Sequence, residues 1–338
     1  MTQKKFKEAM LRGQGRCIQA AQSDPEKYRA VVLWACAHQV AYDPQCEGSK
    51  AGYVYRLINC YPDKGPFLEA LVADFQKTKS DGAWKVLYQA ELLGHFALDG
   101  EETAEAALWS KYEELYAALL KKGRLPKGIF PERDDFSMLC VELARNKKAM
   151  LKIAGDIGKL YLSKDFYDGD DFDWLFASCA KRYMGTLQKH AEKSENIAAY
   201  LRVGLAHEEK LEEMCRKIRE MVAEGKRPVR KPEKPQPAEK TRLIDLVMTT
   251  KTDFLDTTSW HSIHIDVLRM VDHGETAPAE VLRHIYETNF CSCCRETAVR
   301  QMGKRRLLTE EMLQECLLDS NYDIQTYAQR CWARRNKK

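Results

Sequence analysis

The segments AEVLRHIYETNFCSCCRETAVRQM (residues 279–302) and EEMLQECLLDSNYDIQTYAQRCW (residues 310–332) are two copies of one helix–turn–helix pattern. At seven compared positions an apolar residue in one copy meets an apolar residue in the other, at an offset of 31 residues in the first helix and 30 in the second. The aligned pairs are Val281/Met312, Leu282/Leu313, Ile285/Cys316, Tyr286/Leu317, Cys294/Ile324, Ala298/Ala328 and Met302/Trp332. One helix pair cannot cover both of its apolar faces, so the repeat predicts that neighbouring pairs stack on it.

The rest of the chain has the same apolar steps of three and four, and strict alternation is not sustained anywhere. Helices are expected over 28–41, 49–61, 67–75, 84–96, 101–120, 136–162 and 191–222. Pro25 after Ser23 and Asp24 forms a helix start with Asp or Ser as its cap. Only 18 glycines and 11 prolines occur, which argues against a β-sandwich or barrel with many tight turns. Short turns favour antiparallel neighbours, so we predict an all-α chain of antiparallel helix pairs stacked as an α-solenoid.

The second helix of each copy resembles the small-residue pattern of HEAT repeats. The residues that carry this resemblance are Arg295, Ala298 and Val299 in one copy and Asp323, Ile324 and Ala328 in the other. The stretch 34–48 also resembles bacterial HEAT-repeat proteins of unknown activity. The likeness is best over the C-terminal hundred residues or so, although a period near thirty is shorter than the ~40–47 residues of most HEAT units. It implies a HEAT-like solenoid with a concave surface that binds protein or nucleic acid.

One segment divides the sequence. Residues 224–240 hold four prolines among charged residues, and proline removes helix donors and biases its predecessor to extended geometry. We therefore expect a linker over 224–240, between an N-terminal helical-repeat domain at 1–223 and a C-terminal HEAT-like domain at 241–338.

Composition limits where the protein works. No stretch approaches the ~18 apolar residues of a membrane-spanning helix, and the start, Met1 to Lys7, is charged, with no apolar leader after it. The twelve cysteines are scattered, mostly within helical patterns, which is typical of reduced, buried thiols. We expect a cytoplasmic protein with no membrane partner.

The excess of positive over negative charge is confined to the C-terminal third of the sequence. Residues 226–338 contain 20 Lys/Arg against 16 Asp/Glu, whereas the remainder balances at 34 against 34. The basic residues that we select as binding candidates are Arg305, Arg306, Arg330, Arg334 and Arg335. They are expected either to contact phosphates or to be solvated cations near helix C-termini. A second candidate is the turn with Tyr42, Asp43 and Glu47, whose polar groups could also line a pocket beside Trp34 and Tyr53.

The sharpest local feature is a cysteine cluster. Cys291, Cys293 and Cys294, with His284 seven residues before them, could supply four zinc ligands. Two alternatives stay open: a reactive thiol at a helix N-terminus, or a cap with the other thiols packed in the core. His261 and His264 share one helical face, but alone they lack a further ligand, and we interpret them as a polar helix face. We interpret the acidic run 165–173 as helix-capping residues.

The functional hypotheses follow in order. The first is a non-catalytic interaction scaffold that binds a protein partner on a concave helical surface and needs no cofactor, because phosphate-loop, GxGxxG and GxSxG motifs are absent from the sequence. The second is a nucleic-acid-binding protein that uses the basic C-terminal part, with a resemblance to HEAT-like alkylpurine DNA glycosylases as a special case; Trp109, Asp99 and Arg145 would then be available. The third is a metal- or thiol-dependent enzyme that uses the cysteine cluster.

Overall fold

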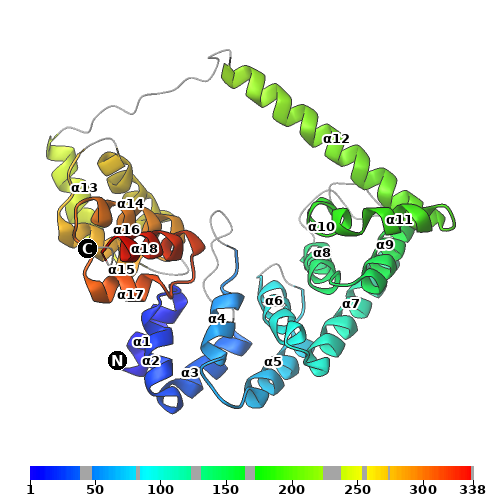
Figure 1. Ribbon diagram of the computed structural model, residues 1–338, viewed down its shortest axis with the longest axis horizontal. Coiled ribbons are helices and arrows are strands. Elements are labelled where there is room, and N and C mark those ends of the chain that lie inside the picture. The colour runs from blue at the N-terminus through cyan, green and yellow to red at the C-terminus, as the bar shows by residue number, and fades with distance from the viewer. Residues whose placement is uncertain are drawn as a thin grey trace. The chain divides into compact units, whose positions relative to one another are not determined.

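Helices make up the regular structure of this chain. The computed structural model describes residues 1–38, 48–80, 84–122, 131–163, 172–223, 237–252, 257–272 and 275–335, and each regular element in these ranges is helical (Figure 1). The all-α prediction is confirmed to that extent. Across the same ranges, no helix combines the length and the apolar character that crossing a bilayer requires.

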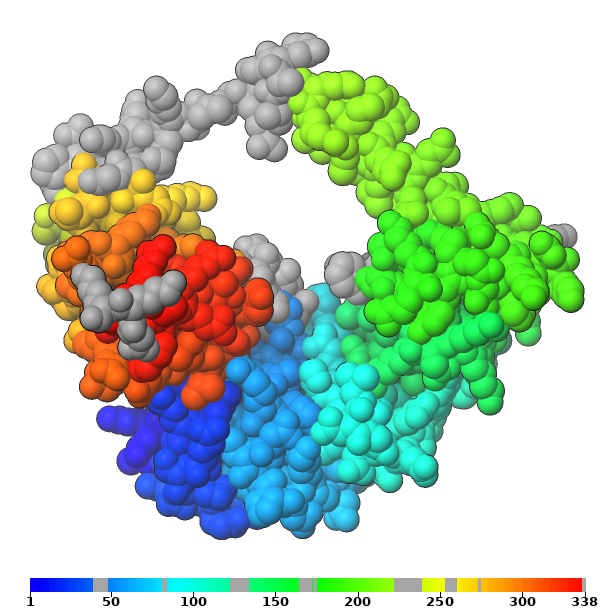
Figure 2. All heavy atoms as spheres, in the orientation of Figure 1, coloured from blue at the N-terminus to red at the C-terminus, as the bar shows by residue number. Residues whose placement is uncertain are grey.

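The chain forms two compact units. The first consists of residues 1–67 together with 232–338, and the second of residues 68–231. The first 67 residues therefore pack with the C-terminal helices that follow the linker expected at 224–240. Figure 2 shows that packing, with the orange and red C-terminal helices against the blue N-terminal ones.

The first unit contains ten helices among the described residues. They are α1 (Gln3–Leu11), α2 (Arg16–Ser23), α3 (Pro25–Ala37), α4 (Ala51–Ile58), α13 (Pro237–Thr249), α14 (Thr257–Asp272), α15 (Ala279–Thr288), α16 (Ser292–Lys304), α17 (Glu310–Cys316) and α18 (Tyr322–Arg335). α3 begins as predicted, with the Asp24 carboxylate accepting from the Lys27 N–H. A carboxylate there satisfies one of the free N–H groups of the first turn.

The sequence repeat corresponds to real helix pairs with a shared core. α15 packs on α16, α17 packs on α18, and α16 also packs on α14 and α18. All fourteen aligned apolar residues belong to one hydrophobic cluster or pack against it. Eleven of the fourteen are buried, and Met312, Leu317 and Trp332 are partly buried. Burial of these side chains is the main source of stability for such a unit, at about 25 cal/mol per Å² of apolar surface.

Polar contacts join the N-terminal helices to this repeat. Arg12 Nε donates to the Thr288 carbonyl at 2.9 Å, and Arg16 Nε contacts Glu315 Oε1 at 2.8 Å. Gly15 lies so close to the backbone of α17 that a Cβ there would collide with the Glu315 carbonyl oxygen. These contacts explain why residues 1–67 belong to the same unit as residues 232–338.

The second unit contains the predicted helices, with one correction and with additional helices between residues 173 and 191. The boundary falls within α5 (Gly65–Lys77), and most of that helix, from Leu68 on, belongs to the second unit. The elements that follow are α6 (Lys85–Leu98), α7 (Glu102–Lys122), α8 (Pro131–Leu143), α9 (Lys147–Leu162), α10 (Asp173–Ser178), the 3₁₀ helix η2 (Ala180–Tyr183), α11 (Met184–Ala191) and α12 (Glu195–Ala223). The single helix expected over 136–162 is two helices, because Asn146 caps α9 by accepting from the Ala149 N–H at 2.9 Å. Asparagine competes for backbone donors in this way and therefore favours helix starts.

Candidate functional site

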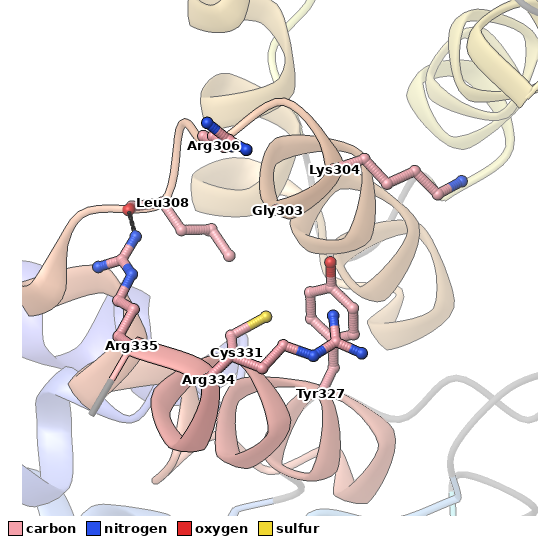
Figure 3. Close-up of a pocket in the computed structure, with 8 residues that line it drawn as sticks. All are labelled: Gly303, Lys304, Arg306, Leu308, Tyr327, Cys331, Arg334 and Arg335. Carbon is pink, nitrogen blue, oxygen red and sulfur yellow. Dashed lines mark hydrogen bonds between the residues drawn. The ribbon is translucent and has the colours of Figure 1, made fainter. Parts of the chain in front are cut away.

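A basic pocket lies between the end of α16, the turn after it and α18. Its volume is about 570 Å³, and it is lined by Gly303, Lys304, Arg306, Leu308, Tyr327, Cys331, Arg334 and Arg335. Figure 3 shows Cys331 pointing from α18 toward the middle of the pocket, and Arg334 reaching along the Tyr327 ring. Both helices belong to the first unit, so one packed core positions the whole pocket.

The turn at the top of the pocket holds a strained arginine. Leu307 N–H donates to the Met302 carbonyl at 2.9 Å, and Arg306 has φ +59°. This is the left-handed helix ending that glycine usually provides, and a residue with a Cβ adopts it at a cost of about 1–2 kcal/mol. Non-glycine residues held in this conformation cluster at functional sites, and here the helix-ending hydrogen bond holds Arg306 at the pocket wall.

Tyr327 sits against α16 because that helix lacks a side chain at Gly303. A Cβ on Gly303 would collide with the Tyr327 hydroxyl. The hydroxyl donates to the Arg300 carbonyl at 3.3 Å, and the Arg300 guanidinium lies 5.3 Å from the ring centroid. Burial raises the pKa of Tyr327 above its ordinary value.

The pocket is electrostatically positive. Its described lining includes four cations, Lys304, Arg306, Arg334 and Arg335, and no carboxylate. Arg335 is also tied down, because its Nη2 donates to the Leu308 carbonyl at 2.5 Å. Guanidinium groups present paired N–H donors that match a carboxylate or a phosphate, so the arrangement suits a compact anionic group.

The structure brings together three of the five predicted arginines. Arg306, Arg334 and Arg335 line the pocket, whereas Arg305 turns away and donates to the Ala277 carbonyl at 2.5 Å. Arg330 is exposed on α18 and is not one of the lining residues. Sequence reasoning missed Tyr327 and Cys331, although their spacing of four, with Arg334 three residues later, already places them on one face of a helix.

The second candidate turn lies outside the described residues. Tyr42, Asp43 and Glu47 fall in 39–47, and most of the acidic run 165–173 falls in 164–171. Tyr53, expected beside that turn, lines a polar pocket of about 450 Å³ together with residues that precede and begin α18. The Tyr53 hydroxyl itself donates to the Gln14 carbonyl at 2.6 Å.

The histidine that lies beside the cysteines is His261 and not the expected His284. One ligand atom from each of His261, Cys291 and Cys294 lies within 4.8 Å of the other two. Cys293 is exposed and His284 is not in this group. The His284 ring instead lies on α15 with its centroid 6.4 Å from that of His264.

The residues considered for a glycosylase site have structural contacts. Arg145 donates to the Gly94 carbonyl at 2.6 Å and pairs with Glu142 at 2.7 Å. Trp109 packs edge-on against Tyr112, and Asp99 is the C-cap of α6. All three residues therefore contribute to helix packing or lie at a helix end.

Comparison with known proteins adds no further constraint. No protein-family model, curated protein or solved structure matches the chain. Two groups of side chains within the described residues point to a function: the basic pocket and the His261–Cys291–Cys294 group.

Proposed function

We propose that this protein is a non-catalytic binding scaffold that takes an anionic segment of a protein partner in the basic pocket. Its helix pairs would stack as a HEAT-like α-solenoid, and the pocket would be the specific contact on that surface. The observation that carries the proposal is the grouping of Arg306, Arg334 and Arg335 around one cavity whose described lining has no carboxylate.

The size and chemistry of the pocket favour a side chain or a chain terminus. About 570 Å³ lies within the ~300–1,000 Å³ typical of pockets that enclose a small ligand or group. Leu308 and Tyr327 supply apolar surface beside the cations, so a carboxylate or phosphate on a short aliphatic stem would fill both parts.

A protein partner accounts for the charge distribution better than nucleic acid does. Nucleic-acid binding draws its affinity from many phosphate contacts along a basic stripe. Here the excess of positive charge is small. Residues 226–338, which contain the pocket, hold 20 Lys/Arg against 16 Asp/Glu, and the rest of the chain balances at 34 against 34. Four cations around one cavity fit a single anionic group better than a continuous backbone.

The test is fluorescence anisotropy of the full-length protein with three labelled probes. These are a glutamate-rich peptide, the same peptide with phosphoserine replacing glutamate, and a single-stranded RNA, each at low and moderate salt. The two peptides distinguish carboxylate from phosphate. We expect peptide binding that weakens about tenfold or more in Arg334→Ala/Arg335→Ala, because each charge-assisted hydrogen bond is worth about 1.5–3 kcal/mol.

Arg330→Ala is the matched control, because it removes one guanidinium from the same helix outside the pocket lining. It should bind the peptides like the unaltered protein. Equal losses in Arg330→Ala and in the pocket variants would reduce the effect to net charge and overturn the proposal. RNA binding tighter than peptide binding, with a steep loss in salt, would transfer the assignment to nucleic acid.

A further inference from the structure

We propose that His261, Cys291 and Cys294 form a zinc-binding site, separate from the basic pocket. His261 lies in the first turns of α14, and the two cysteines lie at the start of α16. Their ligand atoms all lie within 4.8 Å of one another. The histidine is thirty residues from the first cysteine in sequence, so packing of α14 on α16 assembles the group.

The start of α16 suits two thiolates. Cys291 is the N-cap residue and Cys294 is three residues on, so both side chains lie over the same end of one helix. The N–H groups of a helix's first turn and the helix dipole stabilise negative charge at this end. Asn289 Oδ1 accepts from the Cys291 N–H at 2.7 Å and thereby holds the first thiol in place.

The hydrogen bonding of His261 is a second observation that supports the site. Its Nε2 atom is buried and has no hydrogen-bond partner within the described part of the chain. A buried nitrogen left in that state costs about 1–3 kcal/mol, and such an atom calls for an explanation. Coordination to a metal ion beside two sulfur atoms uses the nitrogen lone pair and removes that cost.

A neighbouring hydrogen-bond chain supports the site. Since Asn289 Oδ1 accepts from Cys291, its Nδ2 is the group that donates to His264 Nδ1, at 2.9 Å. His264 therefore carries its proton on Nε2 and acts as an acceptor that orients Asn289. Metal ligands are commonly held by a second layer of this kind, and here the layer ends on the backbone of Cys291.

The ligand types select zinc. Thiolate and imidazole are soft or borderline ligands that favour Zn²⁺ over Mg²⁺ or Ca²⁺. With Zn–S near 2.3 Å and Zn–N near 2.0–2.1 Å, a tetrahedral site needs ligand atoms about 3.5–3.8 Å apart. The three ligand atoms now lie within 4.8 Å of one another, and small side-chain rotations bring them to this tetrahedral spacing. Binding releases the two thiol protons to solvent, and a water molecule completes the four-coordinate shell.

The test begins with metal content. Full-length protein purified under reducing conditions without chelator should contain about one zinc ion per chain by mass spectrometry of its metals. Replacing zinc with Co²⁺ should produce the near-ultraviolet absorption of thiolate–cobalt bonds. His261→Ala, Cys291→Ser and Cys294→Ser should each lower zinc content several-fold.

Cys293→Ser is the matched control, because Cys293 is exposed between the two ligands and is not one of the three. His284→Ala is a second control. Both should retain zinc and the cobalt spectrum. His261→Ala keeps both thiols and their helix, so loss of zinc in that variant, with helicity unchanged by circular dichroism, reports ligation and not misfolding.

Three results would overturn the site. One is less than about one-tenth of a zinc ion per chain in the unaltered protein, both as purified and after incubation with zinc. Another is an equal loss of zinc in Cys293→Ser. The third is a disulfide between Cys291 and Cys294, recognised by a mass two hydrogens lower, that persists after mild reduction and blocks zinc uptake.

Discussion

The Arg295 guanidinium contacts Asp319 Oδ1 at 2.8 Å, and both side chains are 0% exposed. Arg295 also donates to the carbonyl oxygen of Arg12, whose helix lies at the other end of the sequence. Arg56 Nη2 reaches the Asp319 carbonyl at 2.6 Å from α4. One buried ion pair therefore links the repeat helix α16, the turn before α18 and two N-terminal helices.

Breaking this ion pair should strongly destabilise the first unit. Asp319→Ala leaves the Arg295 charge buried without its partner, and the free energy of unfolding should fall by about 3–5 kcal/mol. Urea denaturation followed by circular dichroism measures the change. Arg202→Ala removes an exposed pair with Glu195 and should cost less than about 1 kcal/mol. A loss of similar size in both variants would contradict the role given to Asp319.

Gly15 should not accept a side chain. In Gly15→Ala the new Cβ would collide with the Glu315 carbonyl oxygen, which is backbone and cannot turn aside, so α2 must shift from α17. We expect a loss of about 1–3 kcal/mol or more and faster proteolysis within residues 1–67. Gly155→Ala is the control, because nothing lies within 4 Å of its Cβ and alanine favours helix. Unchanged proteolysis in Gly15→Ala would show that the contact is looser than described.

Two substitutions of Arg306 separate the effect of backbone strain on stability from the effect of the positive charge on binding. Arg306→Gly and Arg306→Ala both remove the guanidinium, but only glycine relieves φ +59°. The glycine variant should be more stable than the alanine variant by about 1 kcal/mol, measured as a difference in melting temperature. Both should bind the anionic peptides more weakly. Equal stability of the two variants would mean that the turn relaxes when the arginine is lost.

Acid should destabilise the first unit through His264. Burial, with smaller contributions from the charges of His284 and His261, lowers the pKa of His264 to about 4. The unfolded chain binds the proton near pH 6.5, before the folded protein does, so the free energy of unfolding decreases as the pH falls from about 6.5 to about 4. The full effect is at most about 3 kcal/mol, and burial lowers the pKa of His284 too, with the same sign.

The measurement is urea denaturation between about pH 7.5 and pH 5, with chelator present so that metal binding does not contribute. His264→Gln, which does not titrate, should show a shallower dependence on pH than the unaltered protein. A slope that is identical in the two proteins would place the acid sensitivity at other groups.

The sequence by itself determined the all-helical character of the chain and the repeat core. Steps of three and four place side chains on one face of a helix, and this relation needs only neighbouring residues. The seven aligned pairs in residues 279–332 were therefore readable as core positions, and Asp24 as a helix cap. The five arginines selected from the sequence were visible as a basic group, but the sequence could not show that Arg306, Arg334 and Arg335 line the pocket while Arg305 and Arg330 do not.

Tertiary structure decided which segments meet. Arg12 reaches Arg295 and Thr288 across more than 270 residues, and His261 reaches Cys291 across thirty. The single helix predicted over 136–162 is interrupted because the Asn146 side chain caps α9, and the sequence alone does not show whether that side chain caps or faces solvent. Local periodicity reports the direction in which a side chain points from its own helix, but the partner it finds depends on how distant helices dock. Packing and buried hydrogen bonds determine how distant helices dock. These contacts form only in the folded chain, so a local sequence pattern does not contain them.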